Sequence, residues 1–164
     1  MQSLDKSKVI IRQATATDAA ALARSRYDFR VTLSPTCERE DIFVERCRIW
    51  MQSRLAVDGP WHCWLAEREQ TIVGHLWVQL IEKIPNPTSE AESHAYVTNF
   101  YVREESRSQG IGSMLLAAAL AWMRERDVHA VILWPTEESR PLYQRHGFAD
   151  PDDLMELLIG EKSY

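Results

Sequence analysis

Hydrophobic and polar positions follow two different periods along the chain, and these periods predict the order of its elements. Runs rich in β-branched and aromatic residues predict strands at 9–12, 61–67, 71–82, 95–102, 128–134 and 154–159. Apolar residues at helical spacing, preceded by cap residues, predict helices that begin near Thr17–Asp18, at Pro35–Thr36, after Gly110 and at Ser139. The predicted order is therefore strand, two helices, three strands, helix, strand, helix and strand.

Several boundaries follow from particular residues. The run 130–133 is apolar at every position, which predicts a strand buried on both faces in the middle of a sheet. Gly147 is expected to end the short helix that Ser139 caps. Segment 83–94 is rich in proline, serine and acidic residues and is predicted to be a loop. A lid over an acceptor site and a surface connection without a role both fit this loop. The second helix is expected to place four residues on one face: Phe43, Cys47, Trp50 and Met51.

The segment 107–113 joins the strand 95–102 to an alanine-rich helix and contains the most informative pattern of the chain. At such a junction, unpaired N–H groups and the positive end of the helix dipole point toward one place. Gly110 and Gly112 have no Cβ, so that a phosphate can approach the backbone closely. Two glycines near a helix start also often do no more than shape a turn. A nucleotide P-loop is excluded because Ser113-Met114 follows Gly112, and Leu115 stands where a dinucleotide fingerprint has its third glycine.

The longer string from Asn99 to Gly112 resembles motif A of the GCN5-related N-acetyltransferase (GNAT) family. The aromatic run Phe100-Tyr101-Val102 is followed, after four residues, by Arg107-x-x-Gly110-x-Gly112, similar to the family's R-x-x-G-x-G/A loop. A second segment, 139–148, resembles the motif B helix, which closes on a Leu-Tyr pair and a Gly-Phe turn. The two segments occur in the order and at the separation usual in the family.

This resemblance implies an α/β (α+β) fold: one domain over 1–164, with a mixed, largely antiparallel sheet flanked by helices. It implies that the strands near 96–102 and 128–134 run parallel and splay apart at their carboxyl ends. The pantetheine arm of coenzyme A would lie in this gap and pair with exposed backbone, like an added strand. A bulge near Asn99–Phe100 would aim an N–H at the thioester carbonyl. The first two helices would border the acceptor pocket.

The activity implied by the resemblance is direct transfer of an acetyl group from acetyl-CoA to a primary amine. The expected coenzyme-binding residues are Phe100, Tyr101, Val102, Arg107, Ser108, Gln109, Gly110, Ile111, Gly112, Ser113 and Ser139. Tyr143 stands at the family's general-acid position, although a core aromatic with a polar tip would have the same pattern. Family members often have a glutamate base on the strand that here contains Thr98-Asn99. Without it, a water chain or one of four candidate side chains could act as the base: Glu82, Glu104, His75 and His94.

Two further questions stay open at the level of the sequence. The missing glutamate is compatible with a catalytically silent acyl-CoA-binding or sensor module of the same fold, whereas Tyr143 argues for an enzyme. The acceptor is either a small amine, such as a polyamine, amino acid or aminoglycoside, or a protein N-terminus or lysine. Acyl groups other than acetyl are equally open. A homodimer is expected only by analogy with the family.

Composition narrows the remaining classes of function. The 164 residues suit one domain, and a formal net charge of −5 argues against a general nucleic-acid binder. An acidic protein does not attract an anionic coenzyme from a distance, so loop N–H groups and Arg103, Arg107 or Arg140 would hold it locally. The same acidity slightly favours a cationic amine as acceptor.

Cysteines, tryptophans and the N-terminus add weaker expectations. Cys37, Cys47 and Cys63 are an odd number without C-x-x-C spacing, so neither disulfides nor a metal site is expected, and buried thiols are predicted. Residues 1–6 lack the apolar core of a signal peptide and no run is long enough to span a bilayer, so a cytoplasmic protein without a membrane partner is expected. The six tryptophans are predicted to be core residues, with Trp50 or Trp77 as alternative linings of an acceptor pocket.

Overall fold

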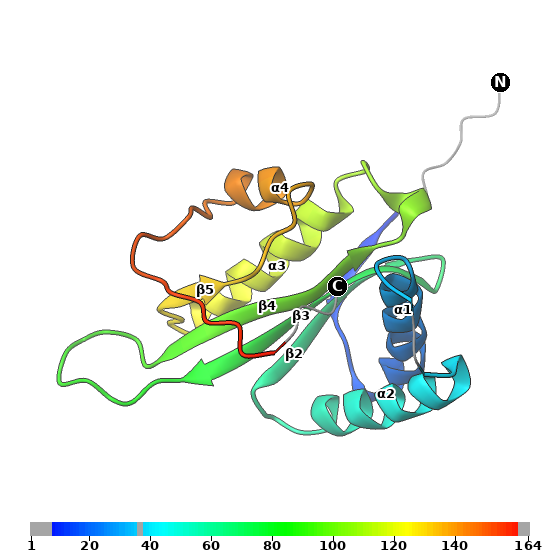
Figure 1. Cartoon of the computed structure of the whole chain (residues 1–164), viewed down its shortest axis with the longest axis horizontal. Coiled ribbons are helices and arrows are strands. Elements are labelled where there is room, and N and C mark those ends of the chain that lie inside the picture. Colours follow the sequence, from blue (N-terminus) through cyan, green and yellow to red (C-terminus); the bar gives the residue numbers. More distant parts are fainter. Residues whose placement is uncertain (1–7, 36–37, 161–164) are drawn as a thin grey trace.

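A five-stranded sheet separates two layers of helices in the computed structural model, which describes residues 8–35 and 38–160 (Figure 1). The strands are β1 (Ile10–Gln13), β2 (Trp61–Arg68), β3 (Thr71–Glu82), β4 (Ser93–Val102) and β5 (Ala130–Ile132), adjacent in that order. Helices α1 (Ala19–Val31) and α2 (Glu40–Leu55) lie on one side, and α3 (Ile111–Glu125) and α4 (Arg140–Arg145) on the other. Two 3-10 helices, η1 (Ala16–Asp18) and η2 (Glu104–Ser106), precede α1 and α3. The expected mixed sheet flanked by helices is confirmed.

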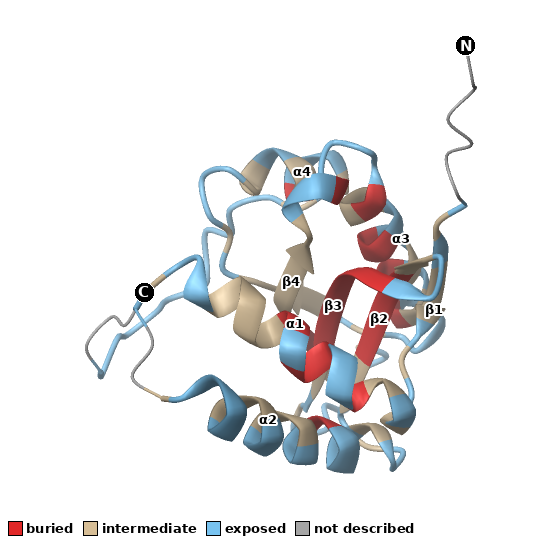
Figure 2. Ribbon diagram, turned by 90° about the vertical axis from the view of Figure 1, so that its right-hand side faces the viewer, coloured by how far each residue is buried: buried red, intermediate tan, exposed pale blue. Residues whose placement is uncertain are grey.

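The core forms two clusters, one on each face of the sheet. Leu76, Leu115 and Leu116 belong to the cluster under α3, whereas Leu22 and Trp77 belong to the cluster under α1 and α2. Buried residues accordingly concentrate in β2, β3 and the sides of α1 and α3 that face them (Figure 2). Because both faces of β2 and β3 are covered, these strands have uninterrupted buried stretches rather than an alternating pattern.

The expected bulge interrupts the pairing of β3 with β4. His75 pairs with Tyr101 and Trp77 pairs with Thr98, so one β3 residue between them faces two residues of β4, Asn99 and Phe100. Asn99 has a φ of +48°, in the left-handed region that asparagine tolerates better than most residues. The bulge is therefore built around an asparagine whose backbone other side chains tolerate poorly.

Strands β4 and β5 are parallel, as expected, but they are paired only from His94 to Tyr96, opposite Ala130 to Ile132. Beyond Tyr96, β4 continues to Val102, and no strand within 8–35 and 38–160 pairs with it on that side. The prediction that β5 lies in the middle of a sheet is wrong. It is a short edge strand with half-buried residues, because no further strand of the described residues pairs with its outer side.

The predicted closing strand at 154–159 is also wrong. These residues form no ladder, and Met155 and Ile159 are more than nine-tenths exposed, at 94% and 92%. Their apolar composition favours a strand, but a strand also needs a neighbour whose N–H and C=O groups match its own. Within the described residues the order of elements ends with α4.

Several helix starts differ from prediction. Helix α2 begins at Glu40 rather than at Pro35–Thr36, with Glu40 and Asp41 in the first turn where the helix dipole favours acidic groups. Thr36 itself lies outside the described residues, as does Cys37. The Ser139 hydroxyl does not cap α4, because it hydrogen-bonds with Thr136 instead. Gly147, with a φ of +91°, follows the end of α4 as predicted.

The loop between β3 and β4 covers residues 83–92, because Ser93 and His94 already belong to β4. Glu90 fastens it through an ion pair with Lys83 (2.8 Å) and a contact with the His129 imidazole (3.0 Å). It projects from the end of the sheet where β4 begins (Figure 1). At 3.4 Å per residue the bulge lies roughly 20 Å further along β4. The structure therefore supports the interpretation as a surface connection and not that of a lid.

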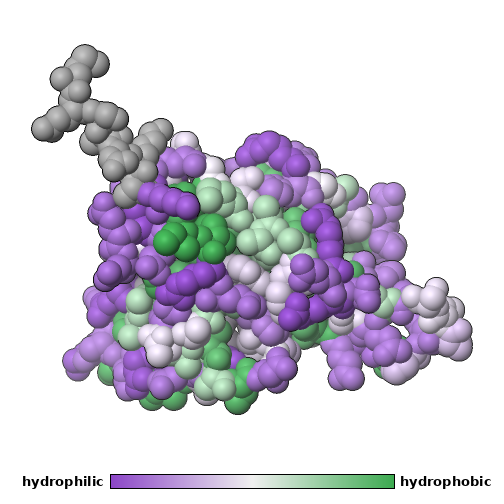
Figure 3. All heavy atoms as spheres, turned by 180° about the vertical axis from the view of Figure 1, so that it is seen from behind, coloured by the Kyte–Doolittle hydropathy of each residue, from purple (hydrophilic) through white to green (hydrophobic). Residues whose placement is uncertain are grey.

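The tryptophans are not all core residues. Trp64 and Trp77 are buried, but Trp134 is 60% exposed and packs edge-on against Tyr96, with ring centroids 5.1 Å apart. Of the described cysteines, Cys63 is buried and Cys47 half-buried, and both are free. Seen from behind, the surface is largely hydrophilic, with apolar groups in separate patches (Figure 3). Residues 8–35 and 38–160 contain no helix long and apolar enough to cross a membrane.

Candidate active site

The loop before α3 has the backbone shape of an anion site. Ser108 and Gly110 have φ values of +58° and +81°, and Gly110 occupies the cap position of α3. The first bond of the helix runs from the Met114 N–H to the Gly110 carbonyl, at 3.0 Å. The N–H groups of 111–113 therefore lie in the first turn, where a helix supplies no acceptors and its dipole is positive.

The two glycines of this loop have different reasons to be glycine. A Cβ on Gly110 would meet no atom within 4 Å, so the space beside it is open and its φ is the constraint. A Cβ on Gly112 would lie 3.4 Å from Leu142 and 3.6 Å from Phe100. Gly112 is thus the point where α3 packs closely against both β4 and α4, which brings the two predicted motifs together.

Most side chains of the predicted coenzyme loop brace the loop itself. Arg107 donates from Nε to the Val102 carbonyl (3.0 Å), and Gln109 donates to the Glu105 carbonyl (3.2 Å) and accepts from Arg68 (2.7 Å). The Ile111 side chain is buried in the core. What the loop offers to a ligand is therefore chiefly its backbone.

The arginines considered for phosphate binding differ in their partners. Arg140 pairs with Asp150 at 2.6 Å, and Arg103 lies 4.0 Å from Glu105. Arg107 has no acidic partner among the described residues. Ser113, at the start of α3, hydrogen-bonds with His146 at 2.6 Å, a second tie between α3 and the end of α4.

Tyr143 is buried between two aromatic rings. Its ring lies edge-on to Phe100 and to Phe148, with centroids 6.1 and 5.6 Å apart, and the residue is 8% exposed. Burial raises the pKa of Tyr143 to about 12, so its hydroxyl keeps its proton at neutral pH. Tyr143 is therefore a core aromatic residue and also a potential proton donor beside Phe100. The two interpretations of Tyr143 from the sequence are compatible.

His75 holds the bulge from below and is not a free base. It is fully buried, and its Nδ1 and Nε2 lie 2.9 Å from the Asn99 carbonyl and 3.0 Å from the Ser25 hydroxyl. A carbonyl only accepts, so Nδ1 carries the proton and Nε2 accepts from Ser25. Burial lowers the pKa of His75 to about 4. His75 is therefore neutral and fully engaged in positioning Asn99.

The other three candidate bases do not adjoin the bulge. Glu82 pairs with Ser93 in the sheet, and His94 pairs with Ile81, at the far end of β4. At least five residues, or roughly 17 Å, separate this end from Asn99. Glu104 is exposed in η2, beyond the end of β4. In residues 8–35 and 38–160, Asn99 is contacted by His75 and by an arginine rather than by a carboxylate.

That arginine is Arg26 of α1, which sequence reasoning missed. Its Nη1 donates to the Asn99 side-chain oxygen at 3.0 Å, and its guanidinium lies 5.9 Å from the centre of the Phe29 ring. Phe29 in turn stacks on Tyr101, with centroids 4.9 Å apart. Burial, and to a smaller extent the neighbouring Arg30, lower the pKa of Arg26. A signal existed in the sequence, because Arg26 continues the helical stripe that begins with apolar residues at 19, 22 and 23.

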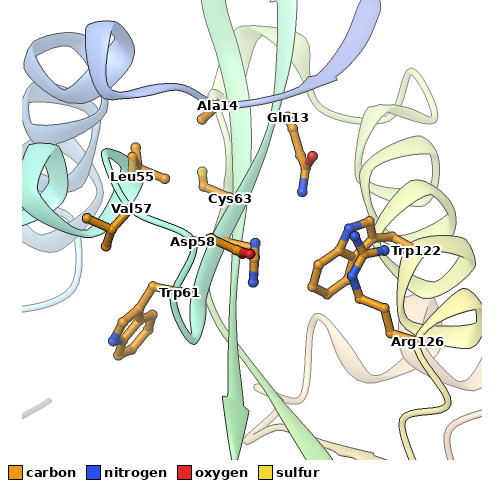
Figure 4. Close-up of a pocket in the computed structure, with 10 residues that line it drawn as sticks. Gln13, Ala14, Leu55, Val57, Asp58, Trp61, Cys63, Trp122 and Arg126 are labelled. Atoms are coloured by element: carbon orange, nitrogen blue, oxygen red, sulfur yellow. The ribbon is translucent and has the colours of Figure 1, made fainter.

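A separate hollow of about 210 Å³ lies elsewhere, between the start of β2 and the last turns of α3 (Figure 4). Trp61, His62, Trp122 and Arg126 are among its lining residues. Arg126 lies 4.0 Å from the centre of the Trp122 ring. None of the predicted coenzyme residues lines this hollow, so it is not part of the candidate site.

Known structures with the same fold come from several organisms. A GCN5-related N-acetyltransferase from Ralstonia eutropha is 25% identical, with 93% of this chain and 100% of that chain covered and a TM-score of 0.74. A predicted acetyltransferase from Clostridium acetobutylicum, crystallised with acetyl-CoA, is 23% identical over 93% and 97%, with a TM-score of 0.71. A ribosomal-protein-alanine N-acetyltransferase from Brucella melitensis is 19% identical over 94% and 100%, with a TM-score of 0.67.

Comparison with protein families gives a direct assignment. No curated protein matches the chain. The model of the acetyltransferase (GNAT) family matches residues 26–148, which include the bulge, the α3 loop and Tyr143. The chain therefore belongs to the acetyltransferase (GNAT) family.

Proposed function

We propose that the protein is an N-acetyltransferase that moves the acetyl group of acetyl-CoA directly to a primary amine. The observation that carries this proposal is the meeting of three features at one end of β4. Phe100, in the bulge, lies 3.6 Å from the Cβ position of Gly112 and against the ring of Tyr143. An oxyanion donor, a phosphate-binding helix start and a proton donor are thus neighbours.

Coenzyme A fits this arrangement in two places. Its pyrophosphate would bind the backbone of Ser108–Ser113, where the space beside Gly110 is open. Its pantetheine arm would pair with Phe100–Val102, on the side where β4 has no neighbouring strand. Ser139 remains a proposed contact from the start of α4. The Clostridium acetobutylicum structure, which contains acetyl-CoA on a similar fold, supports acetyl-CoA as the ligand.

The reaction needs a donor for the oxyanion and one for the departing thiolate. We assign the first role to the N–H of Phe100 and the second to Tyr143. With a tyrosine pKa of about 12 and a thiol pKa near 8.5, complete proton transfer would be uphill by about 5 kcal/mol. Tyr143 is therefore expected to donate a hydrogen bond to the thiolate rather than to surrender its proton.

The amine must also lose a proton before it attacks. For an ammonium of pKa about 10.4 this costs about 4–5 kcal/mol at pH 7. In the absence of an adjacent carboxylate among the described residues, we propose that water takes the proton. Arg26, which contacts the bulge, assists because a neighbouring positive charge lowers the pKa of an ammonium.

The alternative function is a silent acyl-CoA-binding or sensor module. Both ring nitrogens of His75 are hydrogen-bonded, so His75 cannot accept a proton from the amine. This observation favours the silent module. Calorimetric titration of acetyl-CoA tests both readings. Binding followed by release of coenzyme A in a single turnover with a panel of amines would support the enzyme, and binding without release would support the module. No binding of acetyl-CoA would contradict both.

We further propose that residues 1–164 act as one domain and form a homodimer. The exposed apolar segment 154–159 and the unpaired outer side of β5 support a second copy as partner. A single cooperative unfolding transition would agree with one domain. Light scattering that gives twice the chain mass of 19.0 kDa would agree with the dimer, and a monomeric mass would contradict it.

A further inference from the structure

The face of α1 that packs on the sheet changes character along its length. Its first half is apolar, with Ala19, Leu22 and Ala23 all buried. At the same helical spacing its second half continues with Arg26, Phe29 and Arg30. A stripe that covers a sheet is normally apolar throughout. Two arginines on it, the first of which hydrogen-bonds with Asn99 in the bulge of β4, therefore call for an explanation.

Among the described residues, Arg26 has one side-chain hydrogen-bond partner, and that partner is neutral. Its Nη1 donates to the Asn99 side chain at 3.0 Å, while a guanidinium has five N–H donors. No carboxylate lies within ion-pair distance among residues 8–35 and 38–160, although the side chain is half-buried. Leaving a partly desolvated charge without a counter-ion is unfavourable, so this position favours the binding of an anion.

Arg30 strengthens this argument. It lies one turn after Arg26, is half-buried, and likewise has no ion pair with any described residue. Two like charges at this spacing on a helix repel each other. Arg24, on another face of the same helix, is neutralised by Glu40 of α2. The chain has a net charge of −5, yet no carboxylate of the described residues forms an ion pair with either of these two guanidinium groups.

The arginines are not placed to bind the coenzyme phosphates. Arg26 and Tyr101 lie on the α1 side of β4, whereas Phe100 contacts Gly112 at the start of α3 on the opposite side. Arg26 and the start of α3 therefore lie on opposite sides of the sheet. The bulge is where the two sides meet, because Asn99 contacts Arg26 and the next residue is the proposed oxyanion donor.

We propose that the acceptor is a small amine that carries a carboxylate within a few bonds of its amino group, an amino acid. Arg26 and Arg30 bind the carboxylate, and the planar guanidinium fork suits its two oxygens. This places the amine beside the Asn99–Phe100 bulge and the stacked rings of Phe29 and Tyr101. Polyamines and aminoglycosides are disfavoured because their charge repels the pair. The proposal rests on the function proposed above.

The test compares each amino acid with its own carboxamide, which keeps the amine and removes the charge. The intact protein is expected to prefer the acid by roughly ten- to hundredfold in kcat/KM. In Arg30→Gln the preference should fall by a similar factor through a raised KM for the acids, with the amides unchanged. Arg30→Lys should recover part of the preference, because it restores charge but not the fork.

Two controls separate the possible failures. Arg124→Gln removes a positive charge from an exposed position in the last turn of α3 and should leave the preference unchanged. Titration of acetyl-CoA should give the same Kd in all variants, and amino acids should bind the coenzyme A complex even without turnover. Failure to bind acetyl-CoA would contradict the proposed function itself. Normal acetyl-CoA binding with amides or polyamines used as well as acids would overturn only the amino-acid acceptor.

Discussion

The imidazole of His75 donates to the backbone carbonyl of Asn99 across 2.9 Å, from the centre of β3 to the bulge of β4. The hydroxyl of Ser25 in α1 donates to the other ring nitrogen, Nε2, at 3.0 Å. The left-handed backbone of Asn99 is thus fixed by groups from two other elements. Because the backbone of Asn99 is fixed, the orientation of the next N–H group, that of Phe100, is fixed as well.

Acidification should weaken the protein through His75. Its pKa of about 4 in the folded state lies below the 6.5 of an unfolded histidine, so the unfolded state binds the proton more tightly. Stability is therefore complete above pH 6.5 and is lost as the pH falls toward 4, by up to about 3 kcal/mol. Urea unfolding between pH 7 and pH 4.5 measures this loss.

His75→Asn is the matched control, because its amide can still donate to the Asn99 carbonyl but does not titrate. Other groups, including His62 and His94, whose pKa values burial also lowers, contribute equally to both proteins. The difference in unfolding free energy between the two proteins should then shrink as the pH falls. A difference that stays constant over this range would refute the role given to His75.

Removal of the Tyr143 hydroxyl should affect turnover far more than stability. No described side chain hydrogen-bonds to this hydroxyl, so Tyr143→Phe loses no internal partner. We expect kcat to fall by roughly 10- to 100-fold, the value of a hydrogen bond to a developing anion. The Kd of acetyl-CoA should not change. Tyr27→Phe, on the opposite side of the sheet, should be neutral, and an unchanged kcat in Tyr143→Phe would rule out the proton-donor role.

A negative charge at Gly110 should block the coenzyme. Asparagine and aspartate have the same shape and both tolerate the left-handed φ of +81°, so Gly110→Asn and Gly110→Asp differ chiefly in charge. We expect acetyl-CoA to bind at least about tenfold more weakly to the aspartate variant, by an electrostatic effect that salt reduces. Equal affinities in calorimetry would mean that no phosphate approaches this loop.

Gly112 should accept alanine but not valine. The alanine Cβ would make contacts of 3.4 and 3.6 Å with Leu142 and Phe100, which are ordinary distances, and alanine favours the helix by up to about 1 kcal/mol. Valine would push additional methyl groups into these neighbours and should destabilise by roughly 1–3 kcal/mol. Thermal unfolding compares the three proteins. Acetyl-CoA affinity should survive in Gly112→Ala, because the new methyl group points toward Leu142 and Phe100 rather than into the open space beside Gly110.

Local patterns were sufficient for the elements around the coenzyme loop. The hydrophobic period changes from two to 3.6 residues at this loop, and the structure has a strand before it and a helix after Gly110. The predicted bulge at Asn99–Phe100 is also present. These features depend on neighbouring residues, whose backbone preferences do not require the rest of the fold. The match of residues 26–148 to the family includes these motifs.

Local patterns failed where an element needs a distant partner. The segments 130–133 and 154–159 have similarly apolar compositions, yet only the first forms a strand, because β4 supplies its ladder. Whether a run pairs on one side, on both or on neither is a property of the assembled sheet. The apolar run of β5 accordingly lies at an edge.

The sequence by itself determined the loop, the helix start and the tyrosine, since each is encoded by adjacent residues. Only the tertiary structure decided that Arg26 contacts Asn99, 73 positions away, and that His75 hydrogen-bonds with the bulge. The physical reason is that burial and charge pairing depend on which surfaces meet. A sequence records which side chains are present, whereas the fold decides which of them are left without a partner.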